Sequence, residues 1–384
     1  MPHRTLLPAT YIATQVDLQK LVDDLQDESL LAIDTESNSL HAYQERVCLI
    51  QLSTRKKDYI IDPLTIDDLQ PLGKIMASLT IQKIFHAAEY DILCLKRDFG
   101  FTFDNLFDTM VAARICGEKL VGLGNLLQEY AGVKVDKRHQ RDNWGKRPLP
   151  TGSLLYAQMD THYLPFLRDQ FMEKLEKQGH LVEAKEIFNE IRHLPAATVR
   201  KFDPYGFWNL GKPYALSKNE MTILRELFRL REDIARNEKT PTFKVIENKT
   251  LIRLSRNTPK TINELKQIKG LSSRRAARSG KAIIRAIKRG EVAEHLSPPP
   301  RNRLPDPIIN ERYAALHSWR KERAIKRGVE SDIIISKHIL WDVAYKAPTT
   351  LEELQSIKGL GPWRFATYGE EILDVLSKHS IPEG

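Results

Sequence analysis

Short apolar segments alternate with polar turns between residues 29 and 62. The three segments read SLLAIDTES, RVCLIQLST and DYIIDPL, and each is rich in Ile, Leu or Val. This pattern predicts three successive strands that form an antiparallel meander. A helical stretch is expected over residues 67–79, another strand over 83–88, and helices from there to about residue 195. Strands mixed with helices predict an α/β layer architecture for this part of the chain.

The second half of the chain carries a helical pattern that occurs twice. The segment TINELKQIKGL at 261–271 aligns without a gap with TLEELQSIKGL at 350–360, an offset of 89 residues. Such self-similarity predicts two adjacent helical domains of common origin. Ser217 and Glu220 have the spacing of a capping box, which marks the start of the first repeat. The predicted boundaries are 1–200 for the first domain, 201–216 for a connector, 217–291 for the first repeat, 292–305 for a Pro-rich linker and 306–384 for the second repeat.

The positive charge of the chain is concentrated in the first repeat. The whole chain of 384 residues has a formal net charge of +9. Residues 1–200 carry 24 basic against 28 acidic residues, residues 217–290 carry 20 against 7, and residues 306–384 carry 11 against 12. This division predicts that the first domain performs chemistry while the first repeat holds a polyanion such as nucleic acid.

Composition excludes several classes of protein. No segment approaches the about 20 apolar residues that a membrane span needs, and the first residues lack the pattern of a secretory signal. The three cysteines, Cys48, Cys94 and Cys116, lack the spacing of a zinc site and are expected to be reduced thiols. We therefore expect a cytoplasmic protein that contacts no membrane.

Two carboxylates, Asp34 and Glu36, end the first predicted strand. Side chains at i and i+2 of a strand point to the same face, so these two are expected to lie side by side. Two ionised carboxylates so close repel each other unless solvent, basic residues or a cation compensates. Oxygen ligands without a nearby His or Cys cluster favour Mg²⁺ or Mn²⁺ over zinc. For this pair taken alone, a solvated strand end is the simpler interpretation.

Two further segments supply acids and a tyrosine. Asp91, in HAAEYDILCLK, follows a predicted strand and lies in the first turns of a helix. Tyr156 and Asp160 are four residues apart, on one face of a predicted helix. Taken singly, Asp91 is explained by the helix dipole and Tyr156 by a half-buried aromatic position.

Taken together, these motifs resemble those of the DEDD family of 3′→5′ exonucleases, in its tyrosine subtype. The family's Asp-x-Glu matches Asp34 and Glu36, its second acid matches Asp91, and its Tyr-x-x-x-Asp matches Tyr156 and Asp160. The two repeats resemble HRDC domains, which are small helical nucleic-acid-binding modules, and the order of domains is similar to that of the ribonuclease D family. The resemblance implies an α/β RNase H-like exonuclease domain, a mixed sheet flanked by helices, followed by two all-α HRDC domains.

The resemblance also implies two divalent metal ions, Mg²⁺ or Mn²⁺, held by the four acids. Asp34 is expected to bridge both ions, Glu36 and Asp160 to complete one site, and Asp91 to reach the other largely through water. Such ions activate a water molecule and neutralise the leaving 3′-oxygen. Tyr156, with an ordinary pKa near 10, is a poor base at neutral pH and is expected to orient the attacking water.

The expected function is the trimming of 3′ ends of structured RNA, chiefly tRNA precursors, with release of nucleoside 5′-monophosphates. Two alternatives stay open, a DNA 3′→5′ exonuclease and a non-catalytic nucleic-acid-binding protein. The chain lacks a Gly-x-x-x-x-Gly-Lys-Ser/Thr loop, which disfavours a link to DNA replication. No protein partner is predicted. Three polar residues near the motifs are left out of the catalytic set: His86 as a structural histidine, Glu89 as lying off the acid position, and Asp108 as a helix N-cap.

Basic residues in two segments are expected to hold RNA. The loop 134–147 has six basic residues against two acidic ones, although a solvated surface explains such a run equally well. From this loop we predict contacts by Lys137, Arg138, Arg141, Lys146 and Arg147, with Trp144 stacking on a base. In the first repeat, SSRRAARSGKAIIRAIKRG combines a Gly-interrupted turn with basic residues that share a helical face. This is the predicted principal RNA surface, formed by Arg274, Arg275, Arg278, Lys281 and Arg285.

Overall fold

The computed structural model describes residues 5–210, 215–295, 297 and 306–379, which form two compact units. The first unit contains the segments up to residue 36, 47–197 and from 303 onward, and the second contains 37–46 and 198–302. The second repeat thus groups with the first domain. Most of the predicted Pro-rich linker and part of the connector lie outside the described residues. In the described part of the chain, no helix combines the length and apolar character needed to cross a bilayer.

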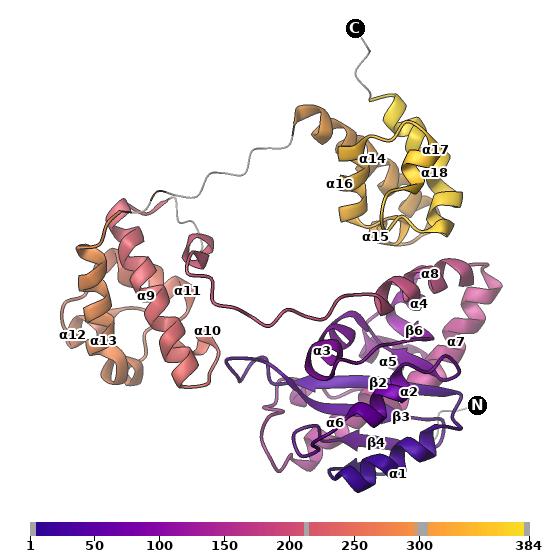
Figure 1. Ribbon diagram of the computed structural model, residues 1–384, viewed down its shortest axis with the longest axis horizontal. Coiled ribbons are helices and arrows are strands. Elements are labelled where there is room, and N and C mark those ends of the chain that lie inside the picture. Colours follow the sequence, from indigo (N-terminus) through magenta and orange to yellow (C-terminus); the bar gives the residue numbers. More distant parts are fainter. Residues whose placement is uncertain (1–4, 211–214, 296, 298–305, 380–384) are drawn as a thin grey trace. The chain divides into compact units, whose positions relative to one another are not determined.

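A six-stranded mixed sheet forms the centre of the first unit, with strand order β1-β4-β3-β2-β5-β6 (Figure 1). The strands are β1 (Thr10–Ile12), β2 (Leu30–Ser37), β3 (Val47–Ser53), β4 (Asp58–Ile61), β5 (Gln82–Phe85) and β6 (Leu106–Asp108). Strands β3 and β4 are antiparallel, whereas β2 pairs in parallel with β5 and β5 with β6. The predicted order of β2, β3 and β4 as successive neighbours is confirmed. Strands β1 and β6 were not predicted, because three residues are too few to show a period of two.

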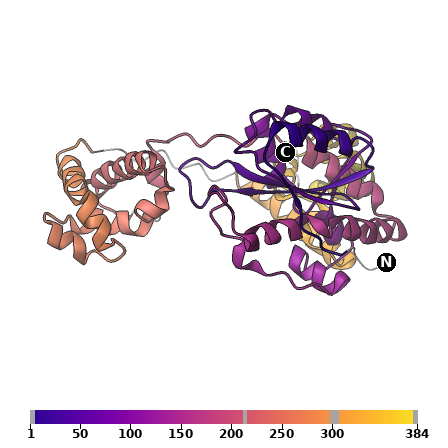
Figure 2. The ribbon, with the colours of Figure 1, turned by 90° about the horizontal axis from the view of Figure 1, so that it is seen from below.

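Helices cover both faces of this sheet, and Figure 2 shows the strands between indigo helices from the start of the chain and magenta helices from further along. They are α1 (Gln15–Leu25), α2 (Gln70–Met76), α3 (Glu89–Phe99), α4 (Thr109–Ile115), α5 (Leu123–Ala131), α6 (Thr151–His162), α7 (Leu164–Lys177) and α8 (Leu181–Arg192), with a 3-10 turn η1 at Lys137–His139. The helix expected over 67–79 is α2, which is shorter at both ends. A mixed sheet with helices on its faces is the predicted class of fold.

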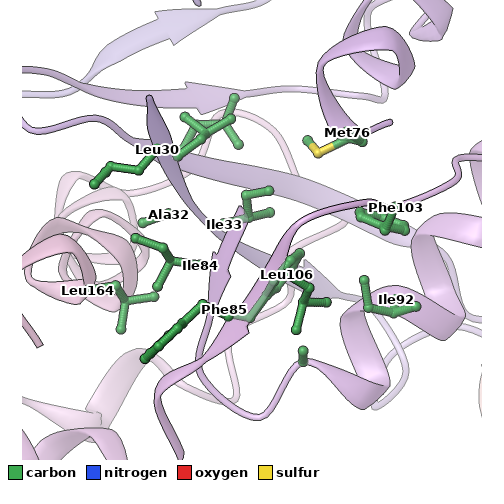
Figure 3. Close-up of a cluster of buried hydrophobic side chains, with 14 of the residues drawn as sticks. Leu30, Ala32, Ile33, Met76, Ile84, Phe85, Ile92, Phe103, Leu106 and Leu164 are labelled. Atoms are coloured by element: carbon green, nitrogen blue, oxygen red, sulfur yellow. The ribbon is translucent and has the colours of Figure 1, made fainter. Parts of the chain in front are cut away.

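Along β2, the residues of the hydrophobic core end directly before the first acid, Asp34. Strand β2 is buried from Leu30 to Ile33 and only half-buried from Asp34 onward. Figure 3 shows Ile33 and Ile92 in one cluster of buried apolar side chains, Ile33 from β2 and Ile92 from α3. Since Asp34 directly follows Ile33 and Asp91 directly precedes Ile92, burial of the two isoleucines holds both acids at the margin of the core.

The second unit is a bundle of helices preceded by a 3-10 turn, η2 (Gly206–Asn209). Its helices are α9 (Lys218–Asn237), α10 (Thr242–Val245), α11 (Asn248–Asn257), α12 (Ile262–Gln267) and α13 (Ser273–Glu291). The capping box predicted at Ser217 and Glu220 is confirmed at the start of α9. The predicted turn at Gly280 is wrong, because α13 continues through it. A Cβ at this position would lie 2.5 Å from Ile262 Cδ1, so glycine permits the close packing of α12 on α13.

The second repeat has the same plan and belongs to the first unit. Its helices are α14 (Pro307–Arg327), α15 (Ser331–Ile334), α16 (Lys337–Lys346), α17 (Leu351–Gln355) and α18 (Pro362–Ser377). The glycine of the shared IKG triplet has a left-handed backbone in both repeats, with φ of 95° at Gly270 and 87° at Gly359. This conformation favours glycine and ends the short helix before the last one begins.

Candidate active site

Three of the predicted acids come together at the end of β2. Carboxylate oxygens of Asp34, Glu36 and Asp160 all lie within 4.8 Å of one another. Asp34 and Glu36 lie at i and i+2 on β2, while Asp160 comes from α6, more than a hundred residues further along the chain. Carboxylates gathered at such distances match the oxygen donors that hard divalent cations prefer, so the residues fit a metal ion.

Asp91 lies beside this group on the first turn of α3. The hydroxyl of Thr35, the residue between Asp34 and Glu36, donates a hydrogen bond to Asp91 Oδ1. The charges of Asp34 and Asp91 also act on each other, because Asp34 raises the pKa of Asp91 after the larger effect of burial. The structure therefore brings all four predicted acids into one electrostatic neighbourhood. The sequence did not predict a role for Thr35, because a threonine between the two acids matches no motif.

The negative charge of each carboxylate makes ionisation of its neighbours less favourable and raises their pKa values. Burial, followed by the charge of Asp160, raises the pKa of Asp34 well above its ordinary range. Burial and then the charge of Asp34 raise the pKa of Glu36 to about 10. Burial likewise raises the pKa of Asp160 to about 7. A cluster of this kind is stable at neutral pH when protons or cations compensate its charge.

Tyr156 lies one helical turn before Asp160 and shares a hydrogen bond with its carboxylate. Burial and the nearby charge of Asp160 raise the pKa of the Tyr156 phenol above its ordinary value, so the hydroxyl keeps its proton. The Trp144 ring centroid lies 6.2 Å from that of Tyr156, and Trp144 is only 1% exposed. The predicted stacking of Trp144 on a base is therefore wrong for this structure, because its ring packs against apolar neighbours beneath the tyrosine.

A network of buried hydrogen bonds connects helix α6 to the sheet. No sequence pattern indicated this network. Asp58, at the start of β4, accepts hydrogen bonds from His162 Nδ1 at 2.8 Å and Gln158 Nε2 at 2.7 Å. It also accepts one from Ser53 Oγ at 2.6 Å. His162 and Gln158 flank Asp160 along the helix. No local pattern pairs residues that lie about a hundred positions apart, so only the fold reveals this network.

The turn between β5 and α3 is held in a similar way. The carboxylate of Asp108 accepts the N–H of Ala88 at 2.7 Å and that of Ala87 at 3.2 Å, while also capping α4. Ala87 has a left-handed φ of 65°, which is unfavourable for alanine and is stabilised by these bonds. The predicted N-cap role of Asp108 is confirmed. His86 Nδ1 lies 2.9 Å from Thr109 Oγ1, which agrees with the expected structural histidine.

The loop 134–147 divides into exposed and anchored residues. Arg147 is half-buried and binds Asp62 through two nitrogens, and it also donates to the Cys48 carbonyl at 2.7 Å. Its guanidinium is used to hold the loop, so the predicted RNA contact by Arg147 does not fit this structure. The other basic residues predicted from this loop are exposed, namely Lys137, Arg138, Arg141 and Lys146.

One more acid, Asp142 in this loop, lies near the cluster and contributes to the raised pKa of Glu36. Its carboxylate accepts from Ser153 Oγ at 2.6 Å and lies 2.8 Å from His139 Nδ1. In the sequence, Asp142 is merely one of two acids in a basic loop. Its environment makes it a group that positions the loop beside Glu36.

The basic surface predicted on the first repeat lies along α13. Arg274, Arg278, Lys281 and Arg285 are exposed and follow one another at helical spacing. Arg275 differs, because it is half-buried and pairs with both carboxylate oxygens of Glu238 at 2.7 and 2.9 Å. Its charge is largely satisfied within the bundle.

The mixed sheet, the acids on β2, α3 and α6, and the tyrosine one turn before the last acid define the class of 3′-5′ exonucleases. The model of the 3'-5' exonuclease family matches residues 9–176, and that of the HRDC domain matches residues 220–287 and 310–376. The chain belongs to the ribonuclease D family.

Individual relatives agree with this family. Ribonuclease D of Granulibacter bethesdensis is 28% identical over 373 residues, which is 95% of this chain and 91% of that one. The exosome complex component 10 homolog of Caenorhabditis elegans is 34% identical over 66% of this chain, which spans only 30% of that relative's length. The crystal structure of Escherichia coli RNase D has a TM-score of 0.67 over 98% of this chain and all of that one, at 23% identity, which shows a shared fold.

Proposed function

We propose that this protein is a metal-dependent 3′→5′ exoribonuclease. The observation that carries the proposal is the convergence of carboxylate oxygens from Asp34, Glu36 and Asp160 within 4.8 Å, with Asp91 in electrostatic reach. Family membership supports the reaction, and the name ribonuclease D of the bacterial relatives supports RNA as the substrate.

Two divalent ions, Mg²⁺ or Mn²⁺, would be held by Asp34, Glu36, Asp91 and Asp160. When bound, they would supply an activated water for attack on phosphorus and charge stabilisation for the leaving 3′-oxygen. The protein's own contribution is to hold the four carboxylates in position around the cations, whose charge would favour the ionised form despite the raised pKa values. Thr35 serves this purpose by fixing the Asp91 carboxylate, and the network around Asp58 does so for Asp160.

Tyr156 is proposed to orient the attacking water and not to remove its proton. Because the pKa of the phenol is raised above its ordinary value, the hydroxyl is protonated at neutral pH and donates a hydrogen bond to Asp160. Its oxygen retains a lone pair that can accept a hydrogen bond from water. Trp144, packed against Tyr156, restricts the movement of the ring.

The proposed substrates are the 3′ ends of structured RNA, chiefly tRNA precursors. The Escherichia coli enzyme with the same fold is described as an exoribonuclease involved in structured RNA processing. In this chain, the exposed basic residues on α13 and in the loop 134–147 support binding of a phosphate backbone. The reaction would release nucleoside 5′-monophosphates one at a time.

The test compares the purified chain on 3′-extended tRNA and on single-stranded DNA, each with Mg²⁺, Mn²⁺ or a chelator. Release of nucleoside 5′-monophosphates from RNA, dependent on metal and much slower from DNA, is the expected result. Equal release from DNA would favour a DNA exonuclease. Binding without release under every metal condition would leave a non-catalytic binding protein and overturn the proposal.

A further inference from the structure

The two helical repeats agree so closely that they can be compared residue by residue. Helices α10, α11 and α13 of the first repeat begin at Thr242, Asn248 and Ser273, and their counterparts α15, α16 and α18 begin at positions 89 residues later. The offset found in the sequence is therefore kept in the structure. The contacts that residues make in one repeat can therefore be used to interpret the equivalent residues of the other repeat.

In the second repeat, the start of the last helix binds carboxylates. The backbone N–H of Trp363, in the first turn of α18, donates to Glu186 Oε2 of α8 at 2.6 Å. Arg364 Nη1 donates to Glu190 Oε1 at 2.8 Å and lies 3.5 Å from Glu186 Oε1. Free N–H groups and the helix dipole make such a helix start an anion site. On this repeat, the anion is supplied by the nuclease domain itself.

In the first repeat, the equivalent face is an open hollow of about 530 Å³, and its lining contains four basic residues and one acid, Glu247. At the offset of 89 residues, Trp363 is replaced by Arg274 and Thr367 by Arg278, and both arginines are exposed on the lining. Ser272 caps α13 by accepting the Arg275 N–H at 3.1 Å. The helix itself provides no acceptor for the other N–H groups of its first turn. The same anion site is thus kept and surrounded by more positive charge.

The residues of α10 that line the hollow also differ between the repeats. Asp332, which pairs with Arg114 of the nuclease domain at 2.6 Å, is replaced by Phe243, and Ile333 is replaced by Lys244. Phe243 is 49% exposed and lines the hollow together with Lys244. Where the second repeat has an acid that binds the nuclease domain, the first repeat has an exposed aromatic ring close to basic residues. Aromatic rings among basic residues are typical of sites for single-stranded nucleic acid.

We infer that this hollow binds one unpaired nucleotide of RNA. Its phosphate lies at the start of α13, between the first-turn N–H groups and the side chains of Arg274 and Arg278, and its base stacks on Phe243. The volume falls within the about 300–1,000 Å³ of small-ligand sites and exceeds the needs of a phosphate alone. Stacking requires an unpaired base, so single strands and loops are preferred over duplex. This inference rests on the proposed action on RNA and names the place where the strand is held.

The test measures binding of a labelled single-stranded oligoribonucleotide to the full chain in chelator, by fluorescence anisotropy over a range of salt. For Arg274→Ala/Arg278→Ala we expect at least tenfold weaker binding at moderate salt and a salt slope that is lower by about 1 to 2. The control Lys218→Ala/Lys288→Ala removes the same charge at exposed positions. Lys288 follows Arg274 by fourteen residues, about 21 Å along the helix, so we expect less than a threefold change.

Phe243→Ala tests the stacking separately. Affinity for the single strand should fall by about tenfold, within the range for one stacked base, while the salt slope and the affinity for blunt duplex RNA stay unchanged. Equal losses for single strand and duplex would overturn the stacking role. If Arg274→Ala/Arg278→Ala binds RNA as its control does, the hollow is not the site. If an acidic peptide with the same net charge as the oligoribonucleotide displaces it, the hollow is a binding site for a protein and the inference is overturned.

Failure of this inference and failure of the nuclease proposal can be told apart. Hydrolysis of a dinucleotide by the wild-type chain depends on the acids around Asp34 and tests the nuclease proposal, whereas binding of the oligoribonucleotide in chelator tests the hollow. If Arg274→Ala/Arg278→Ala binds RNA normally and the wild-type chain hydrolyses the dinucleotide, the exonuclease stands and the hollow is excluded. If Arg274→Ala/Arg278→Ala loses RNA binding and the wild-type chain never releases nucleotides, the hollow is supported and the nuclease is excluded.

Discussion

His162 Nδ1 lies 2.8 Å from Asp58 Oδ2, and both side chains are almost completely buried. This contact joins β4 to the last turn of α6, two residues after Asp160. Because α6 carries both Asp160 and Tyr156, the contact sets how far these side chains reach toward β2. Asp58 and His162 are proposed to act on the reaction through helix α6, so they are positioning residues.

His162→Gln should lower kcat by about ten- to a hundredfold, because a displacement of about 1 Å in a catalytic group has an effect of this size. KM for RNA should change little, since the basic surface of α13 is untouched. Binding of Mn²⁺, measured by electron paramagnetic resonance on the enzyme without RNA, should weaken in parallel. His162→Asn, whose Nδ2 lies nearer to the position of the imidazole Nδ1, should recover part of both losses. A variant that loses stability but keeps its kcat and Mn²⁺ affinity would contradict a positioning role.

Stability without metal should decrease as the pH rises. The pKa of Asp160 is raised to about 7 and that of Glu36 to about 10, so the folded chain holds protons that the unfolded chain releases above about pH 4. This favourable difference is complete at low pH and is lost as the pH rises through the folded values. In chelator, we expect the Tm to fall between pH 5 and pH 8. Added Mg²⁺ or Mn²⁺ replaces the protons, so the increase in Tm should be larger at pH 8.

Differential scanning calorimetry of the wild type and of Asp34→Asn/Glu36→Gln separates this effect from other titrations. The variant carries neutral amides at two of the acids, so its metal-free Tm should vary less with pH. It should also respond little to Mg²⁺. An equal metal-induced shift at pH 5 and pH 8 in the wild type would show that the cations do not displace protons from this cluster.

Asp34→Ala should abolish hydrolysis while leaving RNA affinity within about twofold of the wild type. The acid is central to the cluster, whereas the predicted retention of RNA depends on residues of the second unit. Turnover of 3′-extended tRNA and anisotropy in chelator measure the two properties independently. Tyr156→Phe is a useful companion, because it removes a single hydroxyl and should lower kcat without altering metal binding. If RNA affinity fell as steeply as turnover in Asp34→Ala, binding and catalysis would not be separate.

Sequence patterns predicted the elements whose signals are local. The buried half of β2 followed by Asp34 and Glu36, the capping box at Ser217 and the N-cap at Asp108 each depend on neighbours within a few residues. The three motifs predicted the acid cluster because their order and spacing are characteristic of a family. Local patterning and motif recognition together were sufficient for the fold class.

Contacts between distant residues could not be predicted in this way. Trp144 and Arg147 lie in a basic loop, a context typical of exposed side chains, yet Trp144 packs near Cys48 and Arg147 binds Asp62. Nothing near either residue indicates these partners. The same limit applies to the second repeat, whose near-neutral charge left its role open. The structure explains that charge, because its acids and arginines are paired with groups of the nuclease domain.

One of these pairs, whose carboxylate is completely buried, joins Arg327, at the end of α14, to Glu183 of α8. Arg327 Nη1 donates to Glu183 Oε1 at 2.7 Å and Nη2 donates to Oε2, and the Glu183 side chain has no exposed surface. Arg327→Ala would leave a buried carboxylate without its main partner, which costs about 3–5 kcal/mol in comparable cases. We expect a correspondingly lower free energy of unfolding by urea titration.

A double-mutant cycle with Glu183→Gln shows whether the loss comes from the pair. Glu183→Gln with Arg327→Ala removes both charges, so the double variant should be more stable than the sum of the two single losses predicts. Arg323, on the same helix, pairs with Glu371 at a partly exposed site, so Arg323→Ala is a matched control with an expected loss of about 1 kcal/mol or less. Equal losses for Arg327→Ala and Arg323→Ala would mean that Glu183 is hydrated in solution. The Arg327–Glu183 pair would then not contribute to fixing the second repeat on α8.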